Sequence, residues 1–397
     1  MSIFFIFMVL IIIILIVSSL LNQTRIPLET AFMIAGILVG PHGFGILPLG
    51  ETVQALASVG LIYMLFLAGL EIKMEYIRKI GLRAVAFGIF TFIIPFIMGF
   101  SIGRYFHLGL LGSILLGSIL SSHTIITYPL LKDRGLMKEE IVSIAFFGTV
   151  FTDTGALLIL ALIVAAKAGE AVGAEFIQLG ILFSLFVLVI LGGIPLLAKK
   201  FFKLDHAKRS DFHFIILILL ITAVLAEIIK IHAIVGAFLA GIALAAGLKH
   251  HTDGQPLREV YFFGRGFFIP IFLIVVGMKT NLTILISGAQ SLALTLFIVL
   301  GLILAKISAG LLTGRIFNYG LDRSLALGFM TLPQLAVTLA AAVVGKEMGI
   351  IPMGVFNAVV VMSVVTSLSS PILVKWVFDR MMIKGDVTFD SSRPFEL

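Results

Sequence analysis

Apolar segments of about 20 residues recur along the whole sequence, and they restrict the fold more than any other feature. We count thirteen, at residues 2–21, 27–40, 54–72, 84–103, 108–131, 141–165, 174–198, 212–229, 231–248, 263–278, 288–314, 324–345 and 353–374. A helix of roughly 20 apolar residues is long enough to cross a bilayer. The segments are continuously apolar and do not alternate as the strands of a membrane barrel do. The sequence therefore predicts an all-α polytopic membrane protein.

The composition excludes several classes of protein. Hydrophobic residues make up 60% of the chain and charged residues only 12%, against roughly 25% charged residues in soluble domains. The chain has no cysteine, which excludes disulfides, thiol chemistry and cysteine-ligated metals. It also has no Walker A sequence, no dinucleotide-binding glycines and no HExxH. We therefore expect no enzymatic activity and no cofactor, and any transport should be gradient-driven.

Lysine and arginine are concentrated in alternate loops between the apolar segments. Of the 28 lysines and arginines, 22 fall in one set of loops and Lys306 lies inside a segment. The other set of loops holds Arg104, Lys167, Lys230, Lys279 and Lys346. The positive-inside rule then predicts a plasma (inner) membrane protein with the N-terminus outside and the C-terminus in the cytoplasm. This distribution accounts for the net charge of +7, so we expect no nucleic-acid partner.

Three glycine pairs indicate an internal duplication. The pairs, separated by 205, 208 and 211 residues, are Gly36 with Gly241, Gly69 with Gly277, and Gly117 with Gly328. In this interpretation the first six segments are repeated as the last six, and 174–198 is a linker helix. The copies begin on opposite sides of the membrane, which makes them inverted repeats, as in many secondary transporters. The alternative is chance similarity between glycine-rich apolar helices.

Polar residues interrupt corresponding segments of the two halves. Segment 108–131 carries Ser121, Ser122, His123, Thr124, Thr127, Tyr128 and Pro129, and segment 324–345 carries Thr331, Pro333, Gln334 and Thr338. Discontinuous membrane helices expose free carbonyl and N–H groups that can hold ions. Ordinary proline kinks are the alternative interpretation.

Two charged residues are predicted to lie within the membrane. Asp153 is the only charged residue between Glu140 and Lys167, and Lys306 lies inside segment 288–314. A charge at that depth is costly and is a functional-site hypothesis by default. We expect the two charges to pair, and a static salt bridge between helices is the alternative to a functional pair.

The residues around Asp153 suit a monovalent cation. Thr152 precedes it and Thr149 lies one turn earlier, so hydroxyl, carbonyl and carboxylate oxygens can form a hard-oxygen site for Na⁺ or K⁺. Burial and a nearby lysine act in opposite directions on the pKa of a carboxyl group. Asp153 could then exchange a proton for a metal ion, because it cannot hold both.

The candidate ion- and proton-binding residues follow from these patterns. They are Asp153, Thr152, Thr149, Lys306, Thr124, Ser122 and His123, with Glu227, Pro333 and Gln334 as secondary candidates. Asp153 is the predicted metal ligand. Glu227 is equally well explained by a side chain that extends to the outer membrane surface. Glu71 is interpreted as an interface residue, and a metal or pH-sensing role for His250 and His251 beside Asp253 is a weaker hypothesis.

Six stretches in order along the chain resemble the monovalent cation:proton antiporter superfamily. They are residues 25–41, 65–71, 120–124, 152–153, 236–241 and 270–278. The resemblance is to the second branch, which holds Kef-type potassium exchangers and bacterial Na⁺/H⁺ antiporters. It implies a homodimer whose core helices slide against a scaffold in an elevator-like motion. It also implies that Asp153 is the ion-binding aspartate, that Lys306 is its basic partner, and that the two interrupted helices cross.

The resemblance implies a division of the chain into regions. A membrane transport domain would span 1–380 and a short cytoplasmic tail 381–397. The scaffold would hold residues of about 1–82 and 211–280, and the core those of about 83–165 and 286–378.

The residue before Asp153 bears on stoichiometry. Electrogenic members of the family carry a second acid at this position, whereas this chain has Thr152, so we expect electroneutral, one-for-one exchange. Lys306 weakens this expectation, since a lysine there can itself carry a proton. Two alternatives stay open. One is a sodium-coupled organic anion symporter, which would need a roomier cavity and two sodium sites, and the other is a non-transporting membrane scaffold.

Overall fold

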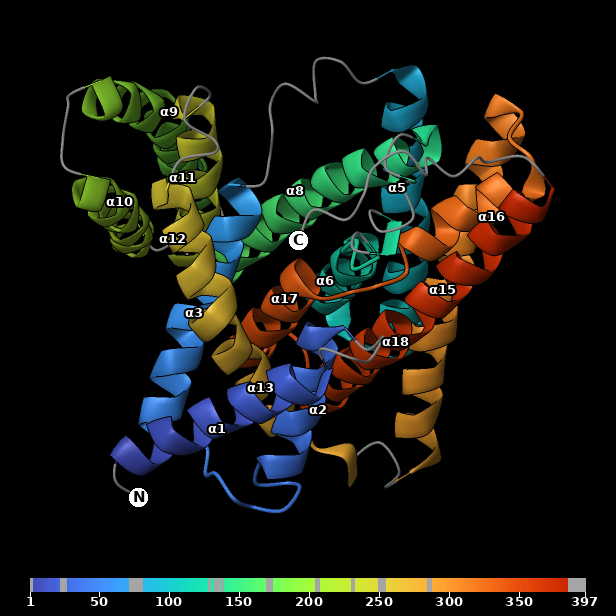
Figure 1. The fold of residues 1–397 in the computed structure, drawn as a ribbon, viewed down its shortest axis with the longest axis horizontal. Coiled ribbons are helices and arrows are strands. Elements are labelled where there is room, and N and C mark those ends of the chain that lie inside the picture. The colour runs from blue at the N-terminus through green and yellow to red at the C-terminus, as the bar shows by residue number, and fades with distance from the viewer. Residues whose placement is uncertain are drawn as a thin grey trace. The chain divides into compact units, whose positions relative to one another are not determined.

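In the computed structural model the described residues form helices joined by turns and loops (Figure 1). These are 3–21, 27–70, 81–127, 130–131, 136, 139–168, 174–203, 208–229, 233–248, 255–283 and 288–384. In these ranges no strand is formed, and nine helices are long and apolar enough to cross a membrane. The prediction of an all-α polytopic fold is therefore confirmed. Tyr128, Pro129, Glu71, His250, His251 and Asp253 lie outside the described residues.

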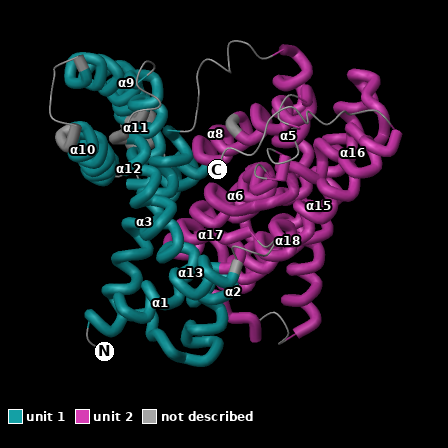
Figure 2. Tube along the Cα trace, in the orientation of Figure 1, with its two compact units in different colours: residues 1–20, 32–78, 160–279 teal, residues 21–31, 79–159, 280–397 magenta. Residues whose placement is uncertain are grey.

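The chain divides into two compact units, each assembled from segments that are distant in sequence (Figure 2). Unit 1 comprises residues 1–20, 32–78 and 160–279, and unit 2 comprises residues 21–31, 79–159 and 280–397.

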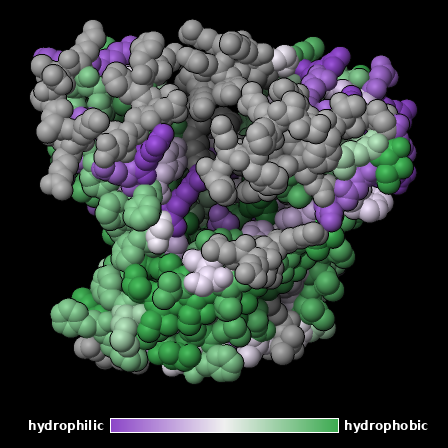
Figure 3. All heavy atoms as spheres, viewed as in Figure 1, coloured by the Kyte–Doolittle hydropathy of each residue, from purple (hydrophilic) through white to green (hydrophobic). Residues whose placement is uncertain are grey.

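Unit 1 is a bundle of apolar helices. Its elements are α1 (Ile3–Leu21), most of α2 (Leu28–Val39), α3 (Glu51–Leu70), α9 (Ala174–Lys203), α10 (Lys208–Ile228), α11 (Ala233–Gly247), α12 (Gln255–Phe263), the π-helix η2 (Gly264–Phe268) and α13 (Ile269–Lys279). Helix α3 packs on α11 and α13, and α11 packs on α9 and α10. Along α1 the side chains are mostly exposed and apolar, and the surface over it is hydrophobic at the lower left of Figure 3. Such a surface suits contact with lipid.

Glycines bring the helices of unit 1 into backbone contact. A Cβ atom built on Gly36 would strike the carbonyl of Ile274, and one on Gly277 would strike that of Met33, so α2 and α13 touch directly. Gly69 and Gly241 pack α3 against α11 in the same way. Small residues allow this close approach, which stabilises helix pairs in membranes through van der Waals contact.

A π-helical segment joins α12 to α13 and is anchored by one tyrosine. The Tyr63 hydroxyl donates a hydrogen bond to the carbonyl of Val260 (2.9 Å), and its ring stacks on Phe268 with centroids 4.9 Å apart. Gly264 leaves room for this ring, because an added Cβ would strike Tyr63 and Leu67. A π-segment leaves α-helical carbonyls without their usual partner, and Tyr63 supplies a donor to one of them.

Unit 2 contains the interrupted helices. Its elements are α5 (Leu82–Tyr105), α6 (Gly109–Ser121), α8 (Glu140–Ala168) up to residue 159, α15 (Ala289–Phe317), α16 (Leu321–Met330), α17 (Ala336–Glu347) and α18 (Met353–Ile383). Helix α5 packs on α6 and α15, α15 packs on α16 and α18, and α17 packs on α6 and α18.

The helix pairs α5/α6 and α15/α16 use matching contacts. Gly99 packs against Gly117, and Gly310 packs against Gly328. Gly103 likewise faces Ser113, and Gly314 faces Ser324. The hydroxyls of these two serines donate to the carbonyls of Gly109 (2.6 Å) and Gly320 (3.0 Å), respectively.

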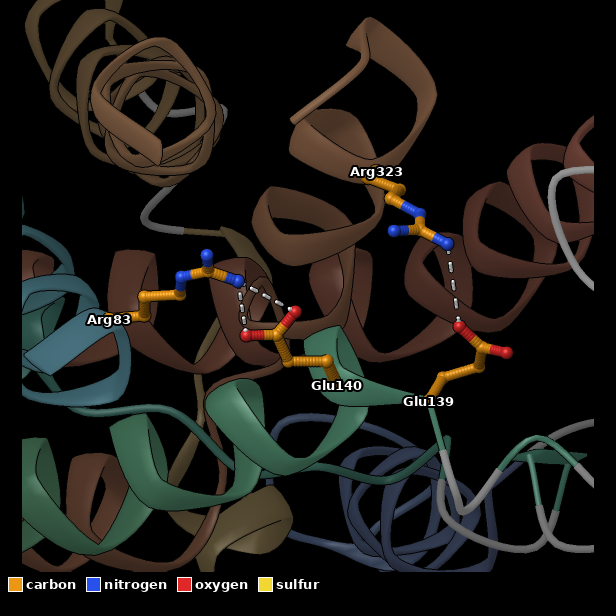
Figure 4. A network of polar contacts seen from close by, with 4 residues as sticks. All are labelled: Arg83, Glu139, Glu140 and Arg323. Atoms are coloured by element: carbon orange, nitrogen blue, oxygen red, sulfur yellow. Dashed lines mark hydrogen bonds and ion pairs between the residues drawn. The ribbon is translucent and has the colours of Figure 1, made fainter. Parts of the chain in front are cut away.

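Charged side chains connect the starts of three helices in unit 2 (Figure 4). Arg83, at the start of α5, contacts both carboxylate oxygens of Glu140, at the start of α8, at 2.8 and 3.1 Å. Arg323, at the start of α16, lies 3.9 Å from Glu139. The first residues of these helices therefore lie at the same end of the unit.

Asp322 is a buried acid that the sequence analysis missed. Its side chain, 6% exposed, accepts a hydrogen bond from Lys384 and lies 3.3 Å from Nε of Arg380. Both basic residues come from the last turns of α18 or just after it. This group attaches the end of α18 to the start of α16.

We expect Asp322→Ala to destabilise the protein by about 2 kcal/mol, because a buried carboxylate and two basic partners lose their contacts. Arg83→Ala should change stability little, since the Arg83–Glu140 pair is about half exposed and exposed pairs contribute little. Thermal unfolding in detergent measures both. Equal destabilisation by the two variants would contradict this ranking.

Candidate ion-binding site

Lys306 is wholly buried on α15 and caps two backbone carbonyls. Its Nζ lies 2.6 Å from the carbonyl of Ser121, the last residue of α6, and 3.0 Å from that of Thr91 on α5. A carbonyl at a helix end lacks its intrahelical partner. Thr91 lacks one because Pro95, four residues later, has no N–H to donate. Sequence analysis missed Thr91, although Pro95 inside an apolar segment was a usable signal.

Asp153 lies on α8, partly buried, beside the end of α6. The Ser122 hydroxyl donates a 2.6 Å hydrogen bond to its Oδ1. Ser122 directly follows the last helical residue of α6, so the interruption of that helix turns its hydroxyl toward the carboxylate. The structure thus brings together two of the predicted site residues.

His123 connects Thr152 to Lys306. Its Nδ1 lies 3.1 Å from the Thr152 hydroxyl and 3.4 Å from Nζ of Lys306, and all three side chains are wholly buried. The Thr152 hydroxyl also lies 3.2 Å from the carbonyl of Thr149. The Thr149 hydroxyl bonds to the carbonyl of Ala145 within its own helix (3.3 Å), so it is directed along α8 rather than toward His123.

The second interruption, between α16 and α17, meets the first. The backbone N–H of Thr124 donates to the carbonyl of Pro333 at 2.8 Å. Gln334 is wholly buried, and its Oε1 accepts a 2.6 Å hydrogen bond from Thr338. Among the residues that the structure describes, the Thr124 hydroxyl is buried and has no hydrogen-bond partner. It is therefore an oxygen available to an ion.

The ammonium group of Lys306 is surrounded by neutral acceptors. Within the described chain, its hydrogen bonds go to the carbonyls of Thr91 and Ser121, and the Thr91 hydroxyl (3.5 Å) and His123 Nδ1 (3.4 Å) lie close to it as well. The pairing of Asp153 with Lys306 stays a prediction.

Glu227 belongs to a different unit from the other candidates. It lies exposed on α10 in unit 1, whereas the other candidates belong to unit 2. No group of three or more histidine, cysteine, aspartate or glutamate side chains suited to a metal occurs among the described residues.

The arrangement combines one carboxylate with hydroxyl and carbonyl oxygens, which are hard ligands. A carboxylate can take up either a proton or a monovalent cation, and that of Asp153 lies beside the first helix break, where it accepts a hydrogen bond from Ser122. A polytopic helical fold with such a centre defines a secondary-active ion transporter.

The family model described as "Sodium/hydrogen exchanger, transmembrane" matches residues 7–380, and the chain belongs to this family. It is a cation/proton antiporter and not an enzyme.

Similar proteins cover nearly the whole chain. The probable Na⁺/H⁺ antiporter 3 of Methanocaldococcus jannaschii is 34% identical over 95% of this chain and 97% of its own length. The Na⁺/H⁺ antiporter NhaS5 of Synechocystis is 31% identical over 92% of this chain, which spans 53% of that relative. The structure of the sodium proton antiporter MjNhaP1 from M. jannaschii at pH 8 aligns with a TM-score of 0.68 at 16% identity, covering 95% of this chain and 96% of that one. This last match shows a shared fold. The family membership decides against the symporter and scaffold alternatives.

Proposed function

We propose that the chain exchanges Na⁺ or K⁺ for H⁺ one for one, with the cation and the proton competing for the carboxylate of Asp153. The observation that carries this proposal is the short hydrogen bond from Ser122 to a partly buried Asp153 at the end of a broken helix. Ser122, Thr124 and nearby backbone carbonyls supply further oxygens. In this scheme Asp153 is the transported cation's only charged ligand, which suits a monovalent ion.

The surroundings of Lys306 support electroneutral exchange. Each carbonyl that holds its ammonium group is neutral, as is the threonine in front of Asp153. An ammonium with three donors and suitable acceptors can stay charged throughout the cycle. One carboxyl group then carries either one proton or one cation, and no net charge moves.

Matching glycine contacts support two inverted repeats with thirteen membrane segments and a crossed pair of discontinuous helices. An offset of 211 residues relates Gly99 to Gly310, and it also relates Gly103 to Gly314, Gly109 to Gly320, Ser113 to Ser324 and Gly117 to Gly328. Equivalent residues thus make equivalent contacts in α5/α6 and α15/α16. Chance resemblance between apolar helices does not explain paired contacts of this kind.

We assign the moving core to unit 2 and the dimer scaffold to unit 1. The candidate ion-site residues other than Glu227 belong to unit 2, which suits an elevator-type core, and the close glycine packing of α2/α13 and α3/α11 suits a rigid scaffold. The shared end of α5, α8 and α16 holds basic side chains that the positive-inside rule places in the cytoplasm. This supports an N-terminus outside and a C-terminus inside the plasma membrane.

The purified protein in liposomes that enclose a pH-sensitive dye tests this function. With an acidic interior, external NaCl, KCl or LiCl should each be compared for alkalinisation of the lumen. We expect Na⁺ or K⁺ to alkalinise the lumen at a rate that does not change when a diffusion potential is imposed. A voltage-dependent rate would reject one-for-one exchange, and no response to any cation from folded protein would reject cation/proton antiport.

A further inference from the structure

The chain passes from unit 1 to unit 2 directly after α13. Lys279 is the last residue of α13 and belongs to unit 1, and Thr280 is the first residue of the unit 2 segment that follows. On the unit 1 side, α13 is held by backbone contact with α2 almost to its end. A Cβ atom on Gly40 would strike the Cα atom of Met278. The unit 1 side of this crossing is therefore fixed as far as Met278.

On the unit 2 side, one buried side chain binds the backbone of Asn281. The amide group of Asn357, wholly buried near the start of α18, accepts a hydrogen bond from the N–H of Asn281 (3.1 Å) and donates one to its carbonyl (3.0 Å). The orientation of this amide is determined, because a flipped amide would face donor with donor and acceptor with acceptor. Both backbone polar groups of Asn281 are thus held to α18.

The side chain of Asn281 extends this attachment along the chain. Its Oδ1 accepts hydrogen bonds from the backbone N–H and the hydroxyl of Thr283, at 3.0 and 2.5 Å. A side chain that bonds to the backbone two residues later fixes a local turn. Residues 281–283 are therefore ordered around a residue that Asn357 attaches to unit 2.

Two residues, Lys279 and Thr280, lie between the fixed points. Three Cα–Cα steps of ~3.8 Å connect Met278 to Asn281, so their Cα atoms can never be more than about 11 Å apart. A crossing of this length lets one unit turn against the other and limits how far it can slide. Hinges of this kind are a few residues at the ends of elements, which absorb changes in φ and ψ.

We propose that Asn357 is a positioning residue for the transport movement: it fixes Asn281 to the core, so that at this crossing the motion of the core is taken up between Met278 and Asn281. This inference rests on the proposed assignment of the moving core to unit 2. Without the two hydrogen bonds, residues 281–283 are released from α18 and the motion is spread over a longer segment. Arrangements of the units off the transport path then become accessible, and the core reaches its end positions more slowly.

Asn357→Ala removes both hydrogen bonds, and Ser370→Ala is its matched control. Ser370 lies on the same helix, is also wholly buried, and donates a 2.7 Å hydrogen bond to the carbonyl of Phe329 within unit 2. In the liposome assay, with the transported cation varied, we expect the maximal rate per folded protein to fall on the order of tenfold in Asn357→Ala. Its KM for the cation should stay within about twofold, because no candidate ion ligand changes, and Ser370→Ala should keep its maximal rate within about twofold.

Hydrogen exchange followed by mass spectrometry shows separately whether the segment is released. The backbone amide of Asn281 should exchange at least about tenfold faster in Asn357→Ala and at the wild-type rate in Ser370→Ala. Unchanged exchange in Asn357→Ala would show that this side chain does not hold the segment. Faster exchange with an unchanged maximal rate, or an equal fall in rate in Ser370→Ala, would show a bond that serves stability alone. Each of these results overturns the proposal.

Asn357→Ser is a second variant, in case the alanine variant does not fold. Its side chain is polar but too short to bind both groups of Asn281, so the same fall in maximal rate is expected. If neither variant folds while Ser370→Ala does, Asn357 serves folding and the proposal is wrong. Failure of the wild type to exchange any cation would instead reject the proposed function, whatever the variants do.

Discussion

Asp153→Asn is expected to abolish exchange while the protein still folds. Asparagine retains an oxygen that accepts the Ser122 hydrogen bond, now 2.6 Å long, so the local contact survives. It has no charge to hold a cation and no acidic proton to release. We expect the rate in the liposome assay to fall by roughly a hundredfold or more, to the level of empty liposomes.

The matched control is Asp153→Glu, which keeps the carboxylate and moves it by one methylene group. It should retain measurable exchange with a changed KM. Gel filtration in detergent establishes that both variants fold. If a folded Asp153→Asn protein kept more than about a tenth of the wild-type rate, Asp153 would not be the exchange site.

Gly277→Val should have the largest effect on stability. A Cβ atom on Gly277 would lie under 3.0 Å from the carbonyl oxygen of Met33 and the N–H nitrogen of Ile37, both backbone atoms of α2. Backbone cannot move aside as a flexible side chain can, so α2 and α13 must separate and lose their packing. We expect a loss of about 4 kcal/mol, among the largest for single substitutions, and an apparent Tm lower by roughly 10 °C.

Gly192→Val is the control for that measurement. Gly192 lies exposed on α9, and an added Cβ there meets nothing within 4 Å. Valine is also a better helix residue than glycine by a few tenths of a kcal/mol. Thermal unfolding in detergent should therefore show no loss for Gly192→Val, and similar Tm values for the two variants would contradict the assigned helix contact.

The helices could be predicted from sequence because a membrane helix is a continuous apolar run, but their ends could not. The last predicted segment stops at 374, whereas α18 continues to Ile383. Its final turns carry Lys375, Asp379 and Arg380, so an apolarity criterion stops where charged residues begin. The start of α12 at Gln255 was missed for the same reason, since Arg258 and Glu259 lie in its first two turns.

The sequence could mark candidate site residues, but not the contacts that they make. A lone carboxylate in an apolar stretch marked Asp153, and polar clusters marked the interruptions that hold Ser122 and His123. Which carbonyls lack donors depends on where a helix ends in three dimensions, so the partners of Lys306 required the structure. Asp322 was missed because an acid near a predicted loop does not reveal that it is buried.

The proposed duplication has a consequence for the hydrogen bond between Lys306 and the carbonyl of Thr91. Pro95 and Lys306 are themselves 211 residues apart, the offset that relates the matching glycines. In that duplication the two residues descend from one position of an ancestral helix. Pro95, in the first copy, has no N–H to donate to the carbonyl of Thr91. Lys306, in the second copy, donates to that carbonyl from its ammonium group instead. The two halves have thereby become complementary rather than identical, and neither copy could substitute for the other in a symmetric assembly.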